Sequence, residues 1–257
     1  MHSPAFENSV FCPFKDAVSA HALAAGLTFS VDNEKHPLCM LAAEELQSHL
    51  RRQQEWSHNF GFTADVAGAV IGKMFGVLVV RTSAQQLGYL AAFSGKLAGG
   101  NHHTGFVPPI FDGVAASGFL NEGMTQLTYI NQKIRSLEQL SQEDHKEEIQ
   151  RLKALRKDHS VSLQKKIYDQ YHFINKAGIS KSLVEIFENA AYKNPPAGAG
   201  ECAAPKLLQY AFRHHMEPLA LAEFWWGLSP KSATWKHGQF YPPCHEKCAP
   251  ILAHMLT

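Results

Sequence analysis

The sequence predicts an α/β (α+β) fold, a small mixed sheet flanked by helices. Two short runs rich in β-branched and aromatic residues, 74–80 and 87–93, predict an antiparallel hairpin with both faces largely buried. Leucines and alanines at helical spacing predict an amphipathic helix over residues 37–54. A third apolar run, 218–227, predicts a strand between two further helices near the C-terminus.

The rest of the chain divides around these elements. Residues 1–35 are weakly patterned, and we expect an N-terminal arm on the surface with one short strand. Residues 36–257 are expected to form a single domain, interrupted by a helical (coiled-coil) insertion over 121–192. Within it, apolar residues spaced by threes and fours over 123–175 predict two long antiparallel helices, joined near 141–144.

The composition excludes several classes of protein. With 24 Lys and Arg against 23 Asp and Glu, the formal net charge is +1, so an RNA partner would need a local basic patch. A hydrophobic fraction of 45% excludes a disordered chain. Five cysteines, an odd number, and no signal-peptide pattern disfavour a secreted disulfide scaffold, so we expect a cytoplasmic protein with reduced thiols. No apolar run reaches the roughly 18 residues of a membrane span.

Charges on the predicted helical hairpin are segregated. Residues 138–148 are mostly acidic, and the second helix is mostly basic. A stripe of cations attracts phosphates, and the candidate RNA-binding residues are Arg151, Lys153, Arg156 and Lys157. The solvated face of a coiled coil is the commoner origin of such charges. The hairpin over 123–175 is also a candidate surface for a partner helix or for self-association.

The last three cysteines form the candidate metal site. Cys202 lies just before Pro205 and an apolar stripe at helical spacing, which predicts that it sits at a helix N-terminus. Cys244 follows Pro243, which predicts a second helix beginning at that cysteine, and Cys248 lies four residues on, on the same helical face. Three thiolates suit one Zn²⁺ ion. The alternative is that all three are buried thiols that act as small hydrophobic side chains.

The other cysteines and the histidines are less informative. We expect Cys12 and Cys39 to be packing thiols. The fourth ligand of a zinc ion stays open, and the candidates by sequence are His214, His215, His237 and His245.

The order of these elements resembles the cytidine deaminase superfamily. Members of that superfamily hold zinc through a His or Cys at one helix and two cysteines at a second. Cys202 matches the first ligand, and Cys244 and Cys248 match the second motif with one more intervening residue than the commonest spacing. The resemblance implies a deaminase-like sheet flanked by helices.

The resemblance fails at the residue that would move protons. The family uses a Glu two residues after the first ligand. That position is Ala204 in this chain, which puts deamination by the usual mechanism in doubt. The nearest carboxylates by sequence are Glu201 and Glu223, and neither has the family's spacing.

Several longer stretches resemble a second family. The N-terminal accessory region of bacterial RluA-type RNA pseudouridine synthases is similar to residues 36–39, 42–47, 72–80, 88–99, 106–109, 196–208, 222–227 and 240–248. In that family the region precedes a catalytic domain with an Arg-Leu-Asp motif, which does not occur in this chain. The resemblance therefore implies an accessory module, and the conversion of uridine to pseudouridine would belong to a domain outside this chain.

These observations leave three functional hypotheses. The first is a zinc-binding module that binds and positions RNA, rRNA or tRNA, with bases stacked on Trp225, Trp226, Phe240 or Tyr241. The second is a zinc-dependent deaminase of a nucleobase or nucleotide, which uses Glu201 or Glu223 in place of the missing carboxylate. The third is a protein-interaction module with a purely structural zinc ion.

Overall fold

A computed structural model describes residues 10–31, 36–63, 66, 68–112, 119–140, 144–188, 190 and 193–257 of the chain. The chain divides into two compact units. The first comprises residues 1–110 and 172–257, and the second comprises residues 111–171.

A five-stranded sheet is the centre of the first unit. In spatial order its strands are β1 (Phe11–Pro13), β3 (Leu87–Phe93), β2 (Lys73–Arg81), β6 (Glu217–Trp226) and β7 (Phe240–Tyr241). The α/β class is confirmed, but the expectation of a mixed sheet is wrong, because all pairings between these strands are antiparallel. Strands β3 and β6 do run in the same direction. Since β2 lies between them, they never pair with each other.

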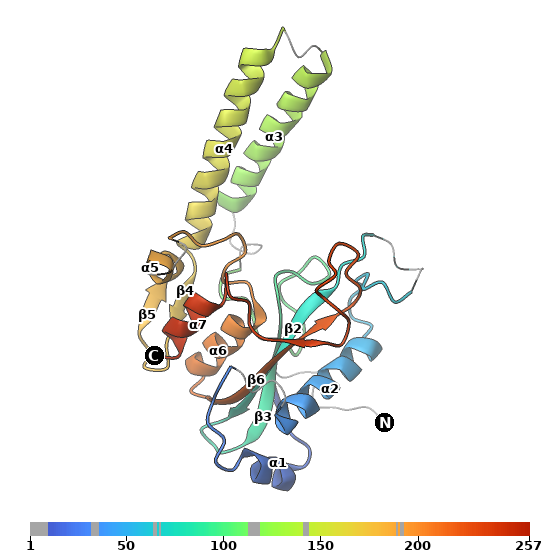
Figure 1. Cartoon of the computed structure of the whole chain (residues 1–257), viewed down its shortest axis with the longest axis vertical. Coiled ribbons are helices and arrows are strands. Elements are labelled where there is room, and N and C mark those ends of the chain that lie inside the picture. The colour runs from blue at the N-terminus through green and yellow to red at the C-terminus, as the bar shows by residue number, and fades with distance from the viewer. Residues whose placement is uncertain are drawn as a thin grey trace. The chain divides into compact units, whose positions relative to one another are not determined.

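Helices cover both faces of this sheet (Figure 1). One face carries α2 (Pro37–Arg52), and the other carries α6 (Ala203–Arg213). The start of α2 agrees with the sequence pattern, since Pro37 occupies its first turn and His36 Nδ1 accepts the amide proton of Leu38 at 3.3 Å. The smaller elements of the unit are α1 (Ala17–Ala24), β4 (His172–Ile174), β5 (Ser180–Ser182), α5 (Leu183–Glu188) and α7 (Ala249–Met255).

The predicted hairpin is confirmed, with a register that runs from Phe75 opposite Phe93 to Arg81 opposite Leu87. Its face toward α2 holds an aromatic core. The ring of Phe75 lies 6.0 Å from that of Phe224 and 6.4 Å from that of Phe93, measured between centroids. Burial of each such ring stabilises the fold by about 1.5–3 kcal/mol.

Parts of the stretch that was expected as a surface arm contribute to this core. Strand β1 pairs with β3, and Cys12 between its neighbours is fully buried. Helix α1 begins where the Asp16 carboxylate accepts the Ser19 amide proton at 3.0 Å, and its Ala20 and Ala24 are buried. Residues 1–9 and 32–35 of that stretch lie outside the described residues.

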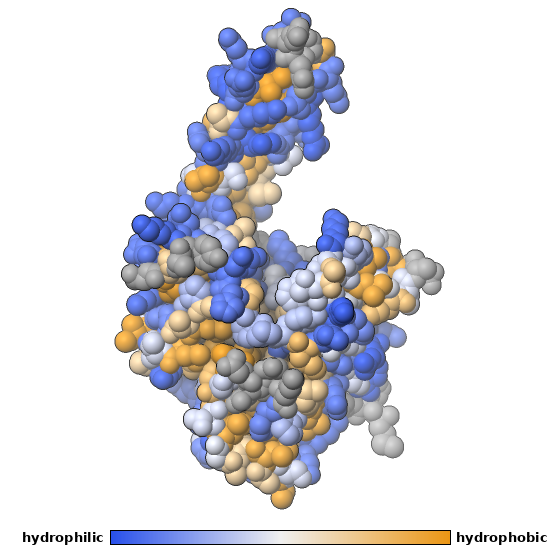
Figure 2. Space-filling view, in the orientation of Figure 1, coloured by the Kyte–Doolittle hydropathy of each residue, from blue (hydrophilic) through white to orange (hydrophobic). Residues whose placement is uncertain are grey.

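The second unit contains two long helices, as predicted: α3 (Phe119–Leu140) and α4 (Lys146–Tyr168). Their shared core is small and consists of Ile130, Ile134, Ile149 and Leu152. Gly123 permits close approach of the two helices, because a Cβ atom there would lie 2.7 Å from Leu163 Cδ1. On the face shown in Figure 2, hydrophilic residues cover most of this helical pair. The expected junction falls mostly on residues 141–143, outside the described residues.

The insertion was expected to extend to residue 192, but residues from 172 onward belong to the first unit. The reason is packing and hydrogen bonding. Phe173 and Phe187 are fully buried, and the Gln209 side chain of α6 bonds the backbone of β4, accepting from Ile174 N and donating to the His172 carbonyl.

Among the helices in the described part of the chain, none combines the length and apolar composition needed to cross a membrane.

Gly76 of β2 should be the most sensitive glycine beneath α6. A Cβ atom there would lie 3.0 Å from Ala203 Cβ and 3.1 Å from Leu207 Cδ1, so Gly76→Ala is expected to cost about 1–3 kcal/mol of unfolding free energy through overpacking. Gly100→Ala is the matched control, since its added methyl group meets nothing closer than 3.5 Å. Urea denaturation measures both variants. Equal stability of the two would contradict the close packing inferred at Gly76.

Candidate metal centre

Cys202 is the N-cap residue of α6, as predicted, with extended backbone angles (φ −72°, ψ 158°). The helix forms there because Leu207, Leu208 and Ala211 recur on one face and are fully buried. A helix N-terminus presents unpaired N–H groups and the positive end of the helix dipole, and both favour a thiolate over a thiol.

The other two cysteines lie at the start of α7, but the expectation of a helix that begins at Cys244 is wrong. Helix α7 begins at Ala249, and Cys248 is its N-cap. The reason is Pro250, which has no N–H to donate to the preceding turn and therefore fits only the first turn of a helix. Residues 244–248 still form a turn, in which Cys248 N donates to the Cys244 carbonyl at 3.1 Å.

The fold brings the three sulfurs together. Cys244 Sγ and Cys248 Sγ are 3.4 Å apart, and the sulfurs of Cys202, Cys244 and Cys248 all lie within 4.8 Å of one another. Two of these side chains are half-buried and Cys248 is buried. This cluster could hold a metal ion.

The three thiols of the cluster shift one another's pKa. Hydrogen bonds with Cys202 and Cys248 hold the pKa of Cys244 well below its ordinary value. The hydrogen bond with Cys244, together with burial, raises the pKa of Cys202 against the lowering effect of the bond with Cys248. Hydrogen bonds with Cys202 and Cys244, together with burial, raise the pKa of Cys248. A cation that binds the cluster would displace the protons that its thiols carry.

Glu223 is a buried carboxylate that interacts electrostatically with all three cysteines of the cluster. It projects from β6 toward the face that α6 covers, is only 4% exposed, and accepts the Ala204 amide proton at 3.1 Å through Oε1. Burial raises the pKa of Glu223 to about 7, against the lowering effect of that hydrogen bond, and the charge of Cys244 raises it further. The Glu223 carboxylate therefore reaches the backbone at the start of α6 from a neighbouring strand.

Glu201, the other candidate carboxylate, is placed differently. Its side chain is exposed, with Oε2 3.7 Å from the position a Cβ atom would take at Gly95. It interacts electrostatically with Lys73 and Lys206. Glu201 therefore lies at the outer rim of the site.

Lys206 is a residue of this site that sequence reasoning missed. It is 5% exposed, and its Nζ donates to the Phe93 carbonyl at 2.8 Å and to the Gly95 carbonyl at 3.4 Å. Burial lowers the pKa of Lys206 to about 8, against the raising effect of the Glu201 and Cys202 charges. The sequence did contain a signal for Lys206: it lies beside the apolar stripe of α6, and a lysine buried there needs hydrogen-bond partners.

A second hydrogen bond joins the loop after β3 to the start of α6, since Gly95 N donates to the Glu201 carbonyl at 2.9 Å. Lys206 and Glu201 flank Cys202 in sequence. Together they tie the loop after β3 to the helix that carries the first sulfur.

The other predicted site residues are not part of this group. Among the described residues, none of the histidines, including the candidates His214, His215, His237 and His245, has a ring nitrogen within 4.8 Å of all three sulfurs. Trp226 is 2% exposed and belongs to the core. Trp225 is half-buried and stacks on Trp235 with centroids 5.3 Å apart. Cys12 and Cys39 are fully buried packing thiols, as predicted.

The candidate RNA-binding residues lie on α4 in the second unit and are exposed. Part of their charge is compensated, since Arg151 pairs with Glu148 at 2.9 Å and Lys153 pairs with Glu138 at 2.7 Å. Arg156 donates to Asn131 Oδ1 at 3.0 Å. Lys157 is exposed beside them.

Comparison of the chain with family models, with curated proteins and with solved structures finds no match in any of the three.

Each cysteine of the cluster is expected to be necessary for metal binding. Cys202→Ser, Cys244→Ser or Cys248→Ser removes one sulfur ligand and should lower affinity for Co²⁺ or Zn²⁺ by at least about a hundredfold, since even neighbours of ligands contribute about 10–100-fold. The thiolate-to-Co²⁺ charge-transfer absorption measures this. Cys39→Ala, which removes a packing thiol, should leave the spectrum unchanged. Full absorption in any Cys→Ser variant would contradict the assignment.

Proposed function

We propose that this protein is a zinc-dependent hydrolytic deaminase of an amino-substituted heterocycle, the class of compound to which nucleobases belong. The observation that carries the proposal is the carboxylate of Glu223, buried beside three thiol groups and bonded to the amide of Ala204. A buried carboxylate is unfavourable for folding, so its retention at this point favours a chemical role.

The ligand set fits zinc with an open position. Zinc prefers four tetrahedral ligands, and thiolates are among the ligands it binds best. The described residues supply three sulfurs and no fourth Cys or His within reach. A structural zinc site uses four protein ligands, whereas a catalytic site keeps one position for water or substrate.

The topology supports the same proposal. A hairpin of β2 and β3, a Cys-bearing helix α6, strand β6 and then two cysteines at the start of α7 follow the deaminase order. In that family the proton-carrying Glu lies two residues after the first ligand. Here the carboxylate of Glu223 reaches the backbone of that position from the adjacent strand.

The reaction would replace an exocyclic amine with a carbonyl. Zinc, when bound, supplies Lewis acidity that makes water a nucleophile at neutral pH. The Glu223 carboxylate accepts a proton from water as the new C–O bond forms. It then donates that proton to the departing nitrogen as the C–N bond breaks, which releases ammonia. Burial keeps the Glu223 pKa near neutrality, where one group can accept and return a proton.

Ammonia release from a panel of nucleobases, nucleosides and nucleotides tests the proposal. We expect Glu223→Gln to lower kcat by about a hundredfold to ten-thousandfold, the usual contribution of a general acid–base group, with zinc content unchanged. Glu201→Gln, at the exposed rim, should change kcat less than about tenfold. No turnover by the zinc-loaded protein on any member of the panel, or full activity of Glu223→Gln, would contradict deamination through this residue.

RNA positioning is a second candidate function, and the exposed cations of α4 favour it. Lys165 and Lys166 are exposed on the same helix as the four predicted residues, and that helix is long enough to follow a phosphate backbone. The resemblance to the accessory region of pseudouridine synthases supports the same role. The ion pairs of Arg151 and Lys153 reduce the charge available to bind phosphates.

Salt dependence tests this second function. Affinity for a structured RNA should fall steeply with salt. Replacement of Arg151, Lys153, Arg156 and Lys157 by Gln should reduce the salt slope by about 0.7–0.9 for each phosphate that these cations neutralise. Replacement of Lys231 and Lys236, exposed in the first unit, serves as the control. An affinity independent of salt would exclude this role.

A further inference from the structure

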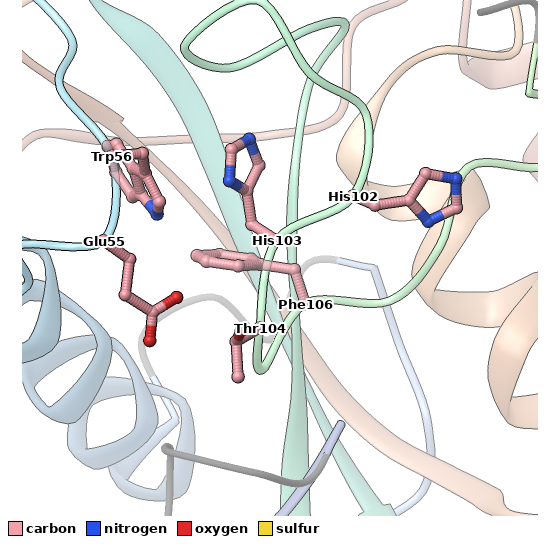
Figure 3. A pocket seen from close by; sticks show the side chains of 6 residues that line it. All are labelled: Glu55, Trp56, His102, His103, Thr104 and Phe106. Carbon is pink, nitrogen blue, oxygen red and sulfur yellow. The ribbon is translucent and has the colours of Figure 1, made fainter. Parts of the chain in front are cut away.

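A hollow of about 430 Å³ lies in the first unit, apart from the three cysteines. Figure 3 shows the six side chains that line it, and the residues are Glu55, Trp56, His102, His103, Thr104 and Phe106. They come from the segment after α2 and from the glycine-rich loop after β3. Its volume falls in the range of small-molecule sites.

Aromatic rings form much of its wall. The rings of Trp56 and His103 lie 5.3 Å apart between centroids, and Phe106 lies below them in the view of Figure 3. Two bonds between the Gln53 side chain and the Trp56 backbone, at 3.1 and 3.2 Å, fix the position of the tryptophan. Rings held in place suit a flat ligand that stacks on one of them.

The orientation of His103 is also fixed. Its Nε2 lies 2.8 Å from the Leu97 carbonyl oxygen, which only accepts hydrogen bonds, so Nε2 carries the proton. His102 points away from the other five side chains and takes no part in the argument (Figure 3).

Besides the two histidines, the polar side chains of the hollow are a carboxylate and a hydroxyl. The Glu55 carboxylate and the Thr104 hydroxyl lie on the same side, across from the Trp56 ring (Figure 3). Glu55 is exposed and has no hydrogen bond or ion pair to another described residue. No Lys or Arg is among the described residues that line the hollow. The lining therefore suits a ligand edge that donates hydrogen bonds and disfavours one that carries its phosphate inside.

From the Glu55 carboxylate beside an aromatic wall, we propose that the hollow binds the base of guanine. Guanine presents two adjacent donors, N1–H and the N2 amine, and a carboxylate accepts both in a bidentate pair. Adenine and cytosine each offer one donor next to an acceptor, which a carboxylate repels. Uracil offers a single N–H between two carbonyls. Stacking on Trp56 supplies the remaining affinity.

The hollow and the cysteine cluster share one structural link, although the guanine proposal stands independently of deamination. The Phe93 ring lies 5.4 Å from the His103 ring and 5.2 Å from the Phe106 ring, between centroids. Lys206 Nζ lies 5.0 Å from the same Phe93 ring and bonds its carbonyl. The loop that lines the hollow is thus fastened beside the helix of Cys202.

Calorimetric titration of the full-length chain with GMP, IMP, AMP and CMP tests the proposal. GMP should bind at submillimolar concentration. IMP, which lacks only the N2 amine, should bind about tenfold more weakly, the usual effect of losing one charge-assisted hydrogen bond. AMP and CMP should bind more weakly still. Equal affinity for GMP and IMP, or no binding of GMP at millimolar concentration, would overturn the proposal.

Two variants locate the site. Glu55→Gln should lower GMP affinity at least about tenfold and remove the preference over IMP, while Glu44→Gln, an exposed carboxylate on α2, should change neither. Trp56→Leu should lower the affinity for GMP and IMP alike, because the ring on which the base stacks is gone. Circular dichroism verifies that each variant is folded. Unchanged GMP binding by folded Glu55→Gln would place the nucleotide elsewhere and overturn the assignment.

The source of the guanine is resolved by a second titration with short single-stranded RNAs, one containing a single guanine among uridines and one of uridines alone. A guanine-containing strand that binds at least tenfold more tightly than GMP identifies a strand as the ligand. Equal affinities identify the free nucleotide. Equal binding of the two strands, with no preference for guanine, would contradict the proposal.

Discussion

The close contact between the start of α6 and the middle of β2 is the constraint on which the rest of the structure depends. It is possible because Gly76 has no side chain, so Ala203 and Leu207 rest directly on the sheet. At this separation Glu223, on the neighbouring strand, can bond the amide of Ala204. Cys202 precedes Ala203 in the chain, so the same contact fixes its position relative to the sheet. A larger residue at position 76 would separate the first sulfur and the carboxylate from each other.

The start of α6 also connects the cysteine cluster with the aromatic hollow of the first unit. Helix α6 carries Cys202 at its start and Lys206 one turn later, and Lys206 holds the carbonyls of Phe93 and Gly95. The loop that follows forms much of the aromatic hollow. The start of α6 therefore positions both the cysteine cluster and the loop.

Much of the fold was predictable because its signals are local. Helix α2 follows from apolar residues at helical spacing, and the hairpin of β2 and β3 and strand β6 follow from short runs of apolar, β-branched and aromatic residues. The expectation of a mixed sheet was wrong because the pattern of apolar residues in a strand does not show whether its neighbours run parallel or antiparallel to it. The start of α7 was misplaced by five residues because the proline after Cys248, rather than the proline before Cys244, determines where the helix begins.

The sequence by itself determined which residues have metal-binding chemistry, since a thiol at a predicted helix start and two thiols at Cys-x₃-Cys spacing are recognisable as possible ligands. Only the tertiary structure decided that the three sulfurs lie within 4.8 Å and that Glu223, rather than Glu201, is the buried carboxylate. Both facts depend on contacts between segments that are far apart in the sequence. Strand pairing and helix packing set such contacts, and no local pattern encodes them.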